Sequence, residues 1–177
     1  MACRSYVDRL LDVAADAPSG MNMRPVRFTV VDDRAKLTQL RDDLMAELSQ
    51  MARDETFPPG LEFVASFVKL WDEGRVDFLF RGAPHLLITS APAASACPEQ
   101  DCLIALSYFE LFAQSLGVGT VWDGLAKMAI GDLVPGARAR LGIPDDHVIG
   151  YAMAFGKPAV QYARTAQHGP AQLHRVA

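Results

Sequence analysis

Apolar residues recur at intervals of three and four in four segments of the chain, the spacing that places them on one face of an α-helix. These segments are residues 6–16, 37–51, 63–71 and 101–116. Pro18 ends the first helix, and Asp33 is suited to cap the second. Pro98 stands where the fourth helix begins, and Gly117 stands where it ends.

Shorter runs of β-forming and apolar residues predict three strands, at residues 27–33, 83–90 and 147–156. The Gly-rich stretch 117–125 is predicted as a turn, and residues 132–141 as a further helix. Residues 157–177 are polar and unpatterned, so we expect an arm that stays irregular or docks on another surface. Since no repeat or second domain is visible, residues 1–177 are predicted to form one domain.

The helix at 101–116 is apolar on almost every side, through Leu103, Ile104, Leu106, Phe109, Leu111, Phe112 and Leu116. A helix of this kind has to be covered all round. In a chain of 177 residues, this predicts a central helix or one that a second subunit covers.

Composition and charge narrow the class of protein. Half of the residues are hydrophobic, and 17 basic against 21 acidic residues give a net charge of −4 without a basic block. This balance argues against nucleic-acid binding. The apolar runs are too short to span a bilayer, and the charged N-terminal segment does not resemble a secretory signal.

Three cysteines, Cys3, Cys97 and Cys102, form an odd set that predicts free thiols in a reduced, cytoplasmic setting. Their spacing fits no recognised zinc pattern, so we predict no metal site.

Two Gly-containing loops are the candidate sites for chemistry: APSGMN at 17–22 and GVGTVWDG at 117–124. The second lacks the Lys-Ser/Thr of a P-loop and does not match G-x-G-x-x-G, and no G-x-S-x-G motif occurs. No acid, base and nucleophile can be combined into a catalytic set, so we predict no catalytic side chain. If the protein is an enzyme, a bound cofactor carries the chemistry. The first loop can also be an ordinary turn.

Four segments, in order, resemble the FMN-dependent nitroreductase family. APSGMNMRPVRFTVVDD resembles its flavin loop and following strand, and LFRGAPHLLIT its second strand. DCLIALSYFELFAQSLGVGTVWDGL resembles its central helix and second flavin loop, and LGIPDDHVIGYAMAFGKP its closing strand. The resemblance covers residues 6–164 and is greatest by eye to the ferredoxin-fused branch, although the chain has no iron–sulfur cysteine motif.

The resemblance implies an α+β fold: a three-layer α-β-α sandwich around a central, mostly antiparallel sheet. It also implies a homodimer with FMN at each of two interface sites. The partner would cover the second face of the helix at 101–116, and the C-terminal arm at 157–177 would wrap the other subunit.

The resemblance also implies which residues contact the flavin. Contacts to the ring and ribityl chain would come from the first loop, through Pro18, Ser19, Gly20 and Asn22. Backbone N–H groups of the second loop would lie near flavin N5 and O4, where negative charge develops on reduction; these belong to Trp122, Asp123 and Gly124. Asp123 can equally be a simple helix cap.

The contacts to the FMN phosphate are where the chain departs from the family. The basic R-R-S-x-R segment is missing, because Arg4-Ser5 lies too close to the first helix; either the chain starts upstream or this clamp is absent. Arg24 replaces a family Gln, Val26 a Trp, and Gln167-His168 a second basic position. Arg164 matches a basic position used for the phosphate, or is a solvated surface residue. Losing one or two charge-assisted contacts weakens binding by roughly one to four decades.

These features lead to three functional hypotheses. The first is an FMN-dependent oxidoreductase that passes a hydride from NADH or NADPH to a nitroaromatic, quinone or similar small acceptor. The second is a non-catalytic member of the same fold that holds a flavin or another small ligand, which the missing basic segment favours. The third is a purely structural dimerisation domain.

Overall fold

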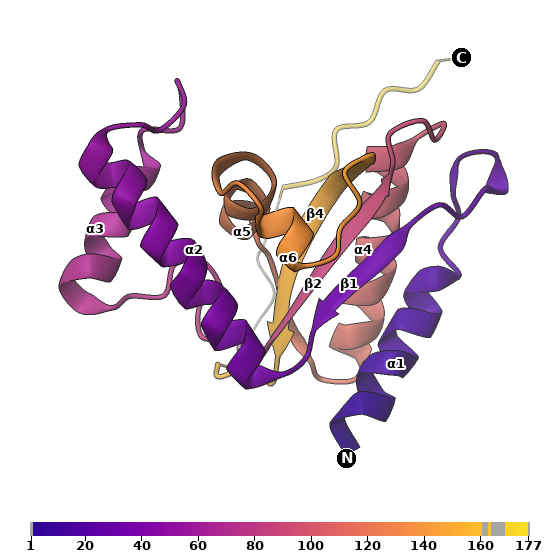
Figure 1. Cartoon of the computed structure of the whole chain (residues 1–177). Coiled ribbons are helices and arrows are strands. Elements are labelled where there is room, and N and C mark those ends of the chain that lie inside the picture. Colours follow the sequence, from indigo (N-terminus) through magenta and orange to yellow (C-terminus); the bar gives the residue numbers. More distant parts are fainter. Residues whose placement is uncertain (1, 161–162, 164–168, 177) are drawn as a thin grey trace.

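A computed structural model of the chain consists of a four-stranded antiparallel sheet between two layers of helices (Figure 1). It describes residues 2–160, 163 and 169–176, with side chains from residue 6 onward. The strand order is β1-β2-β4-β3, so β1 and β3 are the two edges. The strands are β1 (Arg27–Val31), β2 (His85–Pro92), β3 (Gly119–Trp122) and β4 (His147–Gly156).

One face of the sheet is covered by α1 (Ala2–Ala15) and α4 (Pro98–Ser115), which pack side by side. The buried residues that join these helices to the sheet form one cluster: Val7, Leu10, Leu87, Leu106, Phe109, Met153 and Phe155. Burial of this apolar stripe is the main source of stability for α1 and α4, because isolated helices of this length are marginal in water.

The opposite face carries the remaining helices, with α2 and α3 extending beyond the sheet in Figure 1. Asp33 caps α2 by accepting a hydrogen bond from the Lys36 N–H at 2.9 Å. The second core lies between this layer and the sheet and includes Leu44, Leu48, Leu79, Phe80, Ile88 and Ile130. The elements of the layer are α2 (Arg34–Asp54), α3 (Val64–Gly74), α5 (Gly124–Met128), the π-helical turn η2 (Ala129–Leu133) and α6 (Ala137–Arg140).

A β-bulge at Gly150 sets how α4 sits on the sheet. Thr89 pairs with Tyr151 and Ser90 with Ile149, so Gly150 is the extra residue in β4. A Cβ at Gly150 would lie 2.1 Å from the Cβ of Cys102 in α4. Only a glycine therefore allows α4 to approach this closely.

The expected α+β architecture with an antiparallel sheet is confirmed, as are the four long helices and three strands. Two predictions are wrong. Residues 117–125 contain a strand, β3, which is stabilised by pairing with β4. Residues 132–141 are not one helix, because Gly136 takes the left-handed conformation (φ 77°) and separates η2 from α6.

The C-terminal segment carries no regular structure where it is described, at residues 157–160, 163 and 169–176. Arg164, Gln167 and His168 lie outside the described residues. No helix in the described part of the chain is long and apolar enough to cross a membrane.

The close packing at Gly150 leads to a prediction about stability. We expect Gly150→Ala to lower the free energy of unfolding by about 3 kcal/mol, or roughly 10 °C in Tm, because α4 or β4 has to move. Gly131→Ala is the matched control, since its added Cβ would meet its nearest atom, Ile149 Cδ1, at 3.7 Å. Equal melting temperatures for the two variants would contradict the packing argument.

Candidate functional site

The loop between α1 and β1 is anchored to the first turn of α4. Its short 3-10 helix, η1 (Gly20–Asn22), presents the Gly20 N–H to the carboxylate of Asp101 at 2.8 Å. Asp101 is only 3% exposed, and a hydrogen bond to a buried charged group is among the stronger kinds. Gly20 also packs against Cys97, whose Cβ and Sγ would both lie 3.2 Å from an added Cβ.

The same loop holds an unusual backbone shape. Three non-glycine residues take left-handed φ values: Met21 (51°), Asn22 (56°) and Arg24 (49°). Each costs on the order of 1 kcal/mol relative to an ordinary conformation. The Ser19 hydroxyl compensates in part by accepting a hydrogen bond from the Arg24 N–H at 2.7 Å. The loop is therefore a shaped structure rather than a relaxed turn.

Charges at this loop are largely neutralised within it. The Arg24 guanidinium lies 3.6 Å from the Asp16 carboxylate, and both side chains are exposed. The Asn22 side chain is exposed and accepts a long hydrogen bond from Arg24 Nε at 3.5 Å. Pro18, Ser19 and Arg24 border a cavity of about 330 Å³ that extends to Asp101.

The second candidate loop is the junction of β3 and α5. Asp123 caps α5, because its Oδ1 accepts a hydrogen bond from the Ala126 N–H at 2.9 Å. The helix-cap interpretation of Asp123 is thus confirmed. Its own N–H donates to the Ala152 carbonyl at 2.9 Å and is not free for a ligand. Among the described residues, no hydrogen bond engages the N–H groups of Gly124 and Leu125.

Asp123 is also the most perturbed acid at this junction. Burial raises the pKa of its carboxyl from 3.8 to about 6, while the Ala126 N–H and the Arg81 guanidinium oppose the shift. The side chain is 4% exposed. Its Oδ2 is buried and has no hydrogen-bond partner among the described residues.

Tyr151 of β4 lies directly against this junction. A Cβ on Gly124 would be 2.9 Å from the Tyr151 hydroxyl oxygen. The Trp122 ring packs edge-on against Tyr151 with centroids 5.3 Å apart. Trp122 is held in turn by Glu110 of α4, which accepts a hydrogen bond from its indole N–H at 2.7 Å and another from the Thr120 hydroxyl at 3.0 Å.

The two loops border different cavities. Gly124 faces a cavity of about 450 Å³ whose lining includes Tyr151 and Lys127, whereas the first loop faces the cavity near Asp101. They are connected through α4 and the bulge, because Asp101 precedes Cys102, Cys102 faces Gly150, and Tyr151 follows Gly150. Arg164, the remaining predicted site residue, lies outside the described residues.

Three residues at these loops were not predicted from the sequence. Asp101 resembles an ordinary acidic residue in a first helical turn, beside Glu99. Glu110 is an isolated acid on the same helix. Tyr151 bears the only hydroxyl between Gly150 and Gly156, which is the one local signal that could have drawn attention to it.

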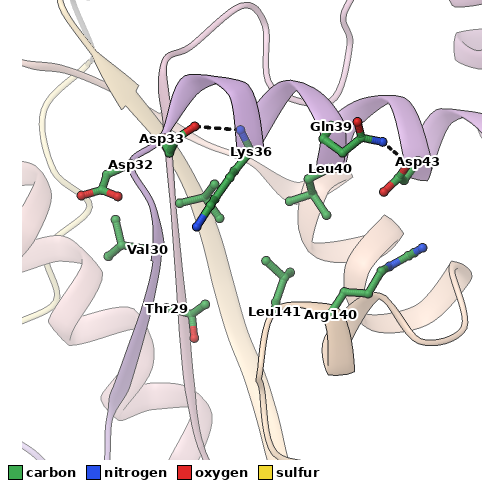
Figure 2. Close-up of a pocket in the computed structure, with 11 residues that line it drawn as sticks. Thr29, Val30, Asp32, Asp33, Lys36, Gln39, Leu40, Asp43, Arg140 and Leu141 are labelled. Carbon is green, nitrogen blue, oxygen red and sulfur yellow. Dashed lines mark hydrogen bonds between the residues drawn. The ribbon is translucent and has the colours of Figure 1, made fainter.

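A third cavity, of about 420 Å³, lies between α2, β1 and α6, away from both loops. Figure 2 shows the Lys36 and Leu40 side chains extending from α2, with Leu141 on the opposite wall. Gln39 donates to Asp43 at 2.7 Å, and Arg140 pairs with Glu47 at 2.8 Å, so the Asp43 and Arg140 side chains have local partners.

The described residues contain no group of three or more His, Cys, Asp or Glu side chains that could hold a metal ion. Cys97 and Cys102 are free thiols, and burial raises the pKa of the Cys102 thiol to about 11.

The nitroreductase family profile matches residues 4–157. A protein of Methanothermobacter thermautotrophicus, provisionally named NADH dehydrogenase/NAD(P)H nitroreductase, is 28% identical over 173 residues, covering 95% of this chain and 73% of its own length. An iodotyrosine deiodinase of Thermotoga neapolitana is 32% identical over 115 residues, or 63% of this chain and 57% of that protein.

The fold likeness extends to solved structures. A nitroreductase with bound FMN from Bacteroides fragilis superposes with a TM-score of 0.73 at 22% identity, covering 97% of this chain and 87% of that one. At this identity the likeness supports the fold.

The raised pKa of Asp123 leads to a pH-dependent prediction. Between pH 3.8 and about 6 the folded protein keeps a proton that the unfolded chain has released, so the free energy of unfolding falls as pH rises through this window. A shift of this size corresponds to about 3 kcal/mol. We expect Asp123→Asn, which cannot ionise, to lose this contribution to the pH dependence in urea denaturation between pH 4 and 7.

The control for this measurement is Asp12→Asn, at an exposed carboxylate on α1. It should follow the wild-type profile. An Asp123→Asn profile parallel to the wild type would show that the Asp123 carboxyl does not titrate in this window.

Proposed function

The chain belongs to the nitroreductase family, and we propose that it is an FMN-dependent oxidoreductase that passes electrons from NAD(P)H to a small acceptor. The observation that carries the proposal is the junction at Gly124. Two backbone N–H groups there are free of hydrogen bonds among the described residues, beside the aromatic rings of Trp122 and Tyr151.

The donor set at this junction fits the polar edge of a flavin ring. N–H groups suit flavin N5 and O4, because both atoms accept hydrogen bonds and gain negative charge on reduction. The family resemblance assigned three N–H groups to this task. Since the Asp123 N–H donates to Ala152, we propose that Gly124 carries the contact, with Leu125 beside it. For Trp122, whose N–H group the resemblance also assigned to the flavin, we propose a different role: its ring forms an aromatic wall beside Gly124.

The first loop would supply the contacts to the other parts of the flavin. We propose that Pro18, Ser19, Gly20 and Asn22 contact the ring and ribityl chain, and that the Asp101 hydrogen bond keeps the loop in shape. The proposed contact to the FMN phosphate has less support, because Arg24 is paired with Asp16. Arg24 would have to exchange that exposed pair for the phosphate, which costs little, since exposed ion pairs contribute about 0–1 kcal/mol. Arg164 is the other proposed phosphate ligand.

When bound, FMN supplies the hydride chemistry, accepting a hydride from NADH or NADPH and delivering electrons to a nitroaromatic, quinone or similar acceptor. The chain's own part is to bind and orient. The lack of a side chain at Gly124 leaves room for the Tyr151 hydroxyl, which an added Cβ would meet at 2.9 Å, and the buried Asp123 fixes the turn by capping α5. No side chain needs to act as a general acid in this scheme. We also retain a reduced, cytoplasmic location, consistent with the free thiols of Cys97 and Cys102.

We propose that the protein is a homodimer in which α4 forms the interface. Four large apolar side chains on α4 are exposed, although Cys102, Leu106 and Phe109 on its other face are fully buried: Leu103, Ile104, Tyr108 and Leu111. A contiguous apolar face of this kind indicates a partner. The C-terminal arm, with Leu173 and Val176 exposed, would add contacts across the dimer.

The first experiment is the visible absorption spectrum of the purified protein, with the chromophore identified after denaturation. We expect one FMN per chain, bleached by NADH or NADPH under anaerobic conditions and restored by a nitroaromatic or quinone. Bound FMN that neither nucleotide reduces would favour a flavin carrier, or a member of the ferredoxin-linked branch with another donor. Protein that stays colourless with added FMN would refute the proposal.

A pair of variants tests whether the first loop binds the flavin. Asp101→Ala removes the acceptor for the Gly20 N–H, so we expect FMN affinity to fall by about one to two decades. Asp101→Asn retains an acceptor oxygen and should stay within a few-fold of the wild type. Equal affinities for the two variants would count against the loop as part of the site.

The proposed dimer predicts a mass near twice the 19.3 kDa of one chain by light scattering. Leu111→Glu places a charge at the most exposed apolar position of α4, and we expect it to shift the protein toward monomer. Leu70→Glu, at a half-exposed leucine on α3, is the matched control and should leave the mass unchanged. A monomeric wild type would exclude the dimer.

A further inference from the structure

The cavity beside Gly124 has a composition that the flavin contacts do not require. Its walls are Gly124, Leu125, Lys127, Met128, Asp132 and Tyr151, and its volume is about 450 Å³. The cavity is open to solvent, so a small organic molecule would lie against its wall, oriented by a few polar groups among apolar ones. Here Leu125 and Met128 supply apolar surface, and Lys127 and Tyr151 supply donors.

Tyr151 presents a fixed and unused hydroxyl to this cavity. The hydroxyl oxygen lies 2.9 Å from the position that a Cβ on Gly124 would take, and no hydrogen bond engages it within the described part of the chain. The ring is held by Trp122, which Glu110 locks in place from α4. A donor whose position is set by two layers of packing is suited to orient a ligand.

Lys127 brings a positive charge to the same place. Its ammonium lies 5.7 Å from the centroid of the Tyr151 ring. It has no ion pair within 4.0 Å among the residues that the structure describes, Asp132 included. Since Gly124 and Lys127 are three residues apart on α5, they share one face of the helix. The ammonium is therefore free to attract an anionic group that enters beside Gly124.

We propose that Lys127 and Tyr151 form the subsite for the electron acceptor and select planar aromatic acceptors that carry one carboxylate. Lys127 pairs with the carboxylate, the Tyr151 hydroxyl donates a hydrogen bond to an oxygen of the ligand, and the Tyr151 ring with Leu125 and Met128 contacts the aromatic body. Asp132 on the cavity wall disfavours a second negative charge. This inference rests on the proposed function, because the ligand it assigns is the acceptor of that reaction.

The alternative is that Lys127 and Tyr151 make only a structural cation–π contact, which contributes about 0.5–1 kcal/mol at exposed sites. A purely structural contact predicts no preference for charged ligands. Discrimination between a charged and a neutral ligand of the same shape therefore separates the two interpretations.

The test is isothermal titration calorimetry of the purified full chain, with whatever flavin it retains, against 4-nitrobenzoate and 4-nitrobenzamide. We expect the wild type to bind the carboxylate about tenfold more tightly, and Lys127→Met to abolish that preference while leaving 4-nitrobenzamide within twofold. Tyr151→Phe should weaken both probes by about threefold. Lys69→Met, at an exposed lysine on α3, is the control and should change neither.

Two results would overturn the subsite: no detectable binding of 4-nitrobenzoate by the wild type, or a Lys127→Met variant that keeps the preference. The flavin content of each sample is read from its absorption spectrum. Protein without FMN that still prefers the carboxylate, through Lys127, would refute the proposed function and leave the subsite standing. Protein with reducible FMN and no preference for the carboxylate would refute the subsite and leave the proposed function standing.

Discussion

The close approach of α4 to β4 at Gly150 is the constraint on which both candidate loops depend. The bulge there changes the alternation of β4, so that Ile149 and Ala152, three residues apart, enter the same core, whereas Tyr151 turns toward α4. With Cys102 seated on Gly150, the preceding Asp101 reaches the Gly20 N–H. The close contact that Gly150 permits thus positions Asp101, which anchors the first loop, and Tyr151, whose ring lies against the second loop.

Local sequence patterns predicted the elements whose stability is decided locally or by one buried stripe. Residues 101–116 and 147–156 carry enough apolar periodicity to identify α4 and β4 without knowledge of their neighbours. β3 was missed because it has only four residues, lies in a stretch with several glycines, and forms a strand only when β4 lies beside it. The helix predicted at 132–141 failed because Gly136 breaks it, a signal that was present in the sequence and outweighed by the surrounding apolar residues.

The candidate site was predictable to a smaller extent. The two loops were identified by their composition and by the family resemblance, but the contacts that shape them join distant residues. Gly20 and Asp101 are 81 positions apart, and Gly124 meets Tyr151 across the sheet. Neither contact leaves a spacing that a single sequence can reveal. Asp123 caps a helix and has a raised pKa. The raised pKa likewise depends on burial that only the fold creates.

Both loops concentrate unfavourable terms that the rest of the fold has to offset. The first holds three non-glycine residues in left-handed conformations and exposes Met21 at 85%. The second buries a carboxylate oxygen of Asp123 that has no hydrogen-bond partner in the part of the chain that the structure describes. Strain and unsatisfied groups of this kind persist where the surrounding structure enforces them, and they cluster at functional sites. A structural domain would gain stability by relaxing either loop, for example with glycine at position 21. Two such loops lie next to α4 and β4. This concentration of unfavourable conformations is the physical reason for favouring a ligand-binding protein over a purely structural one.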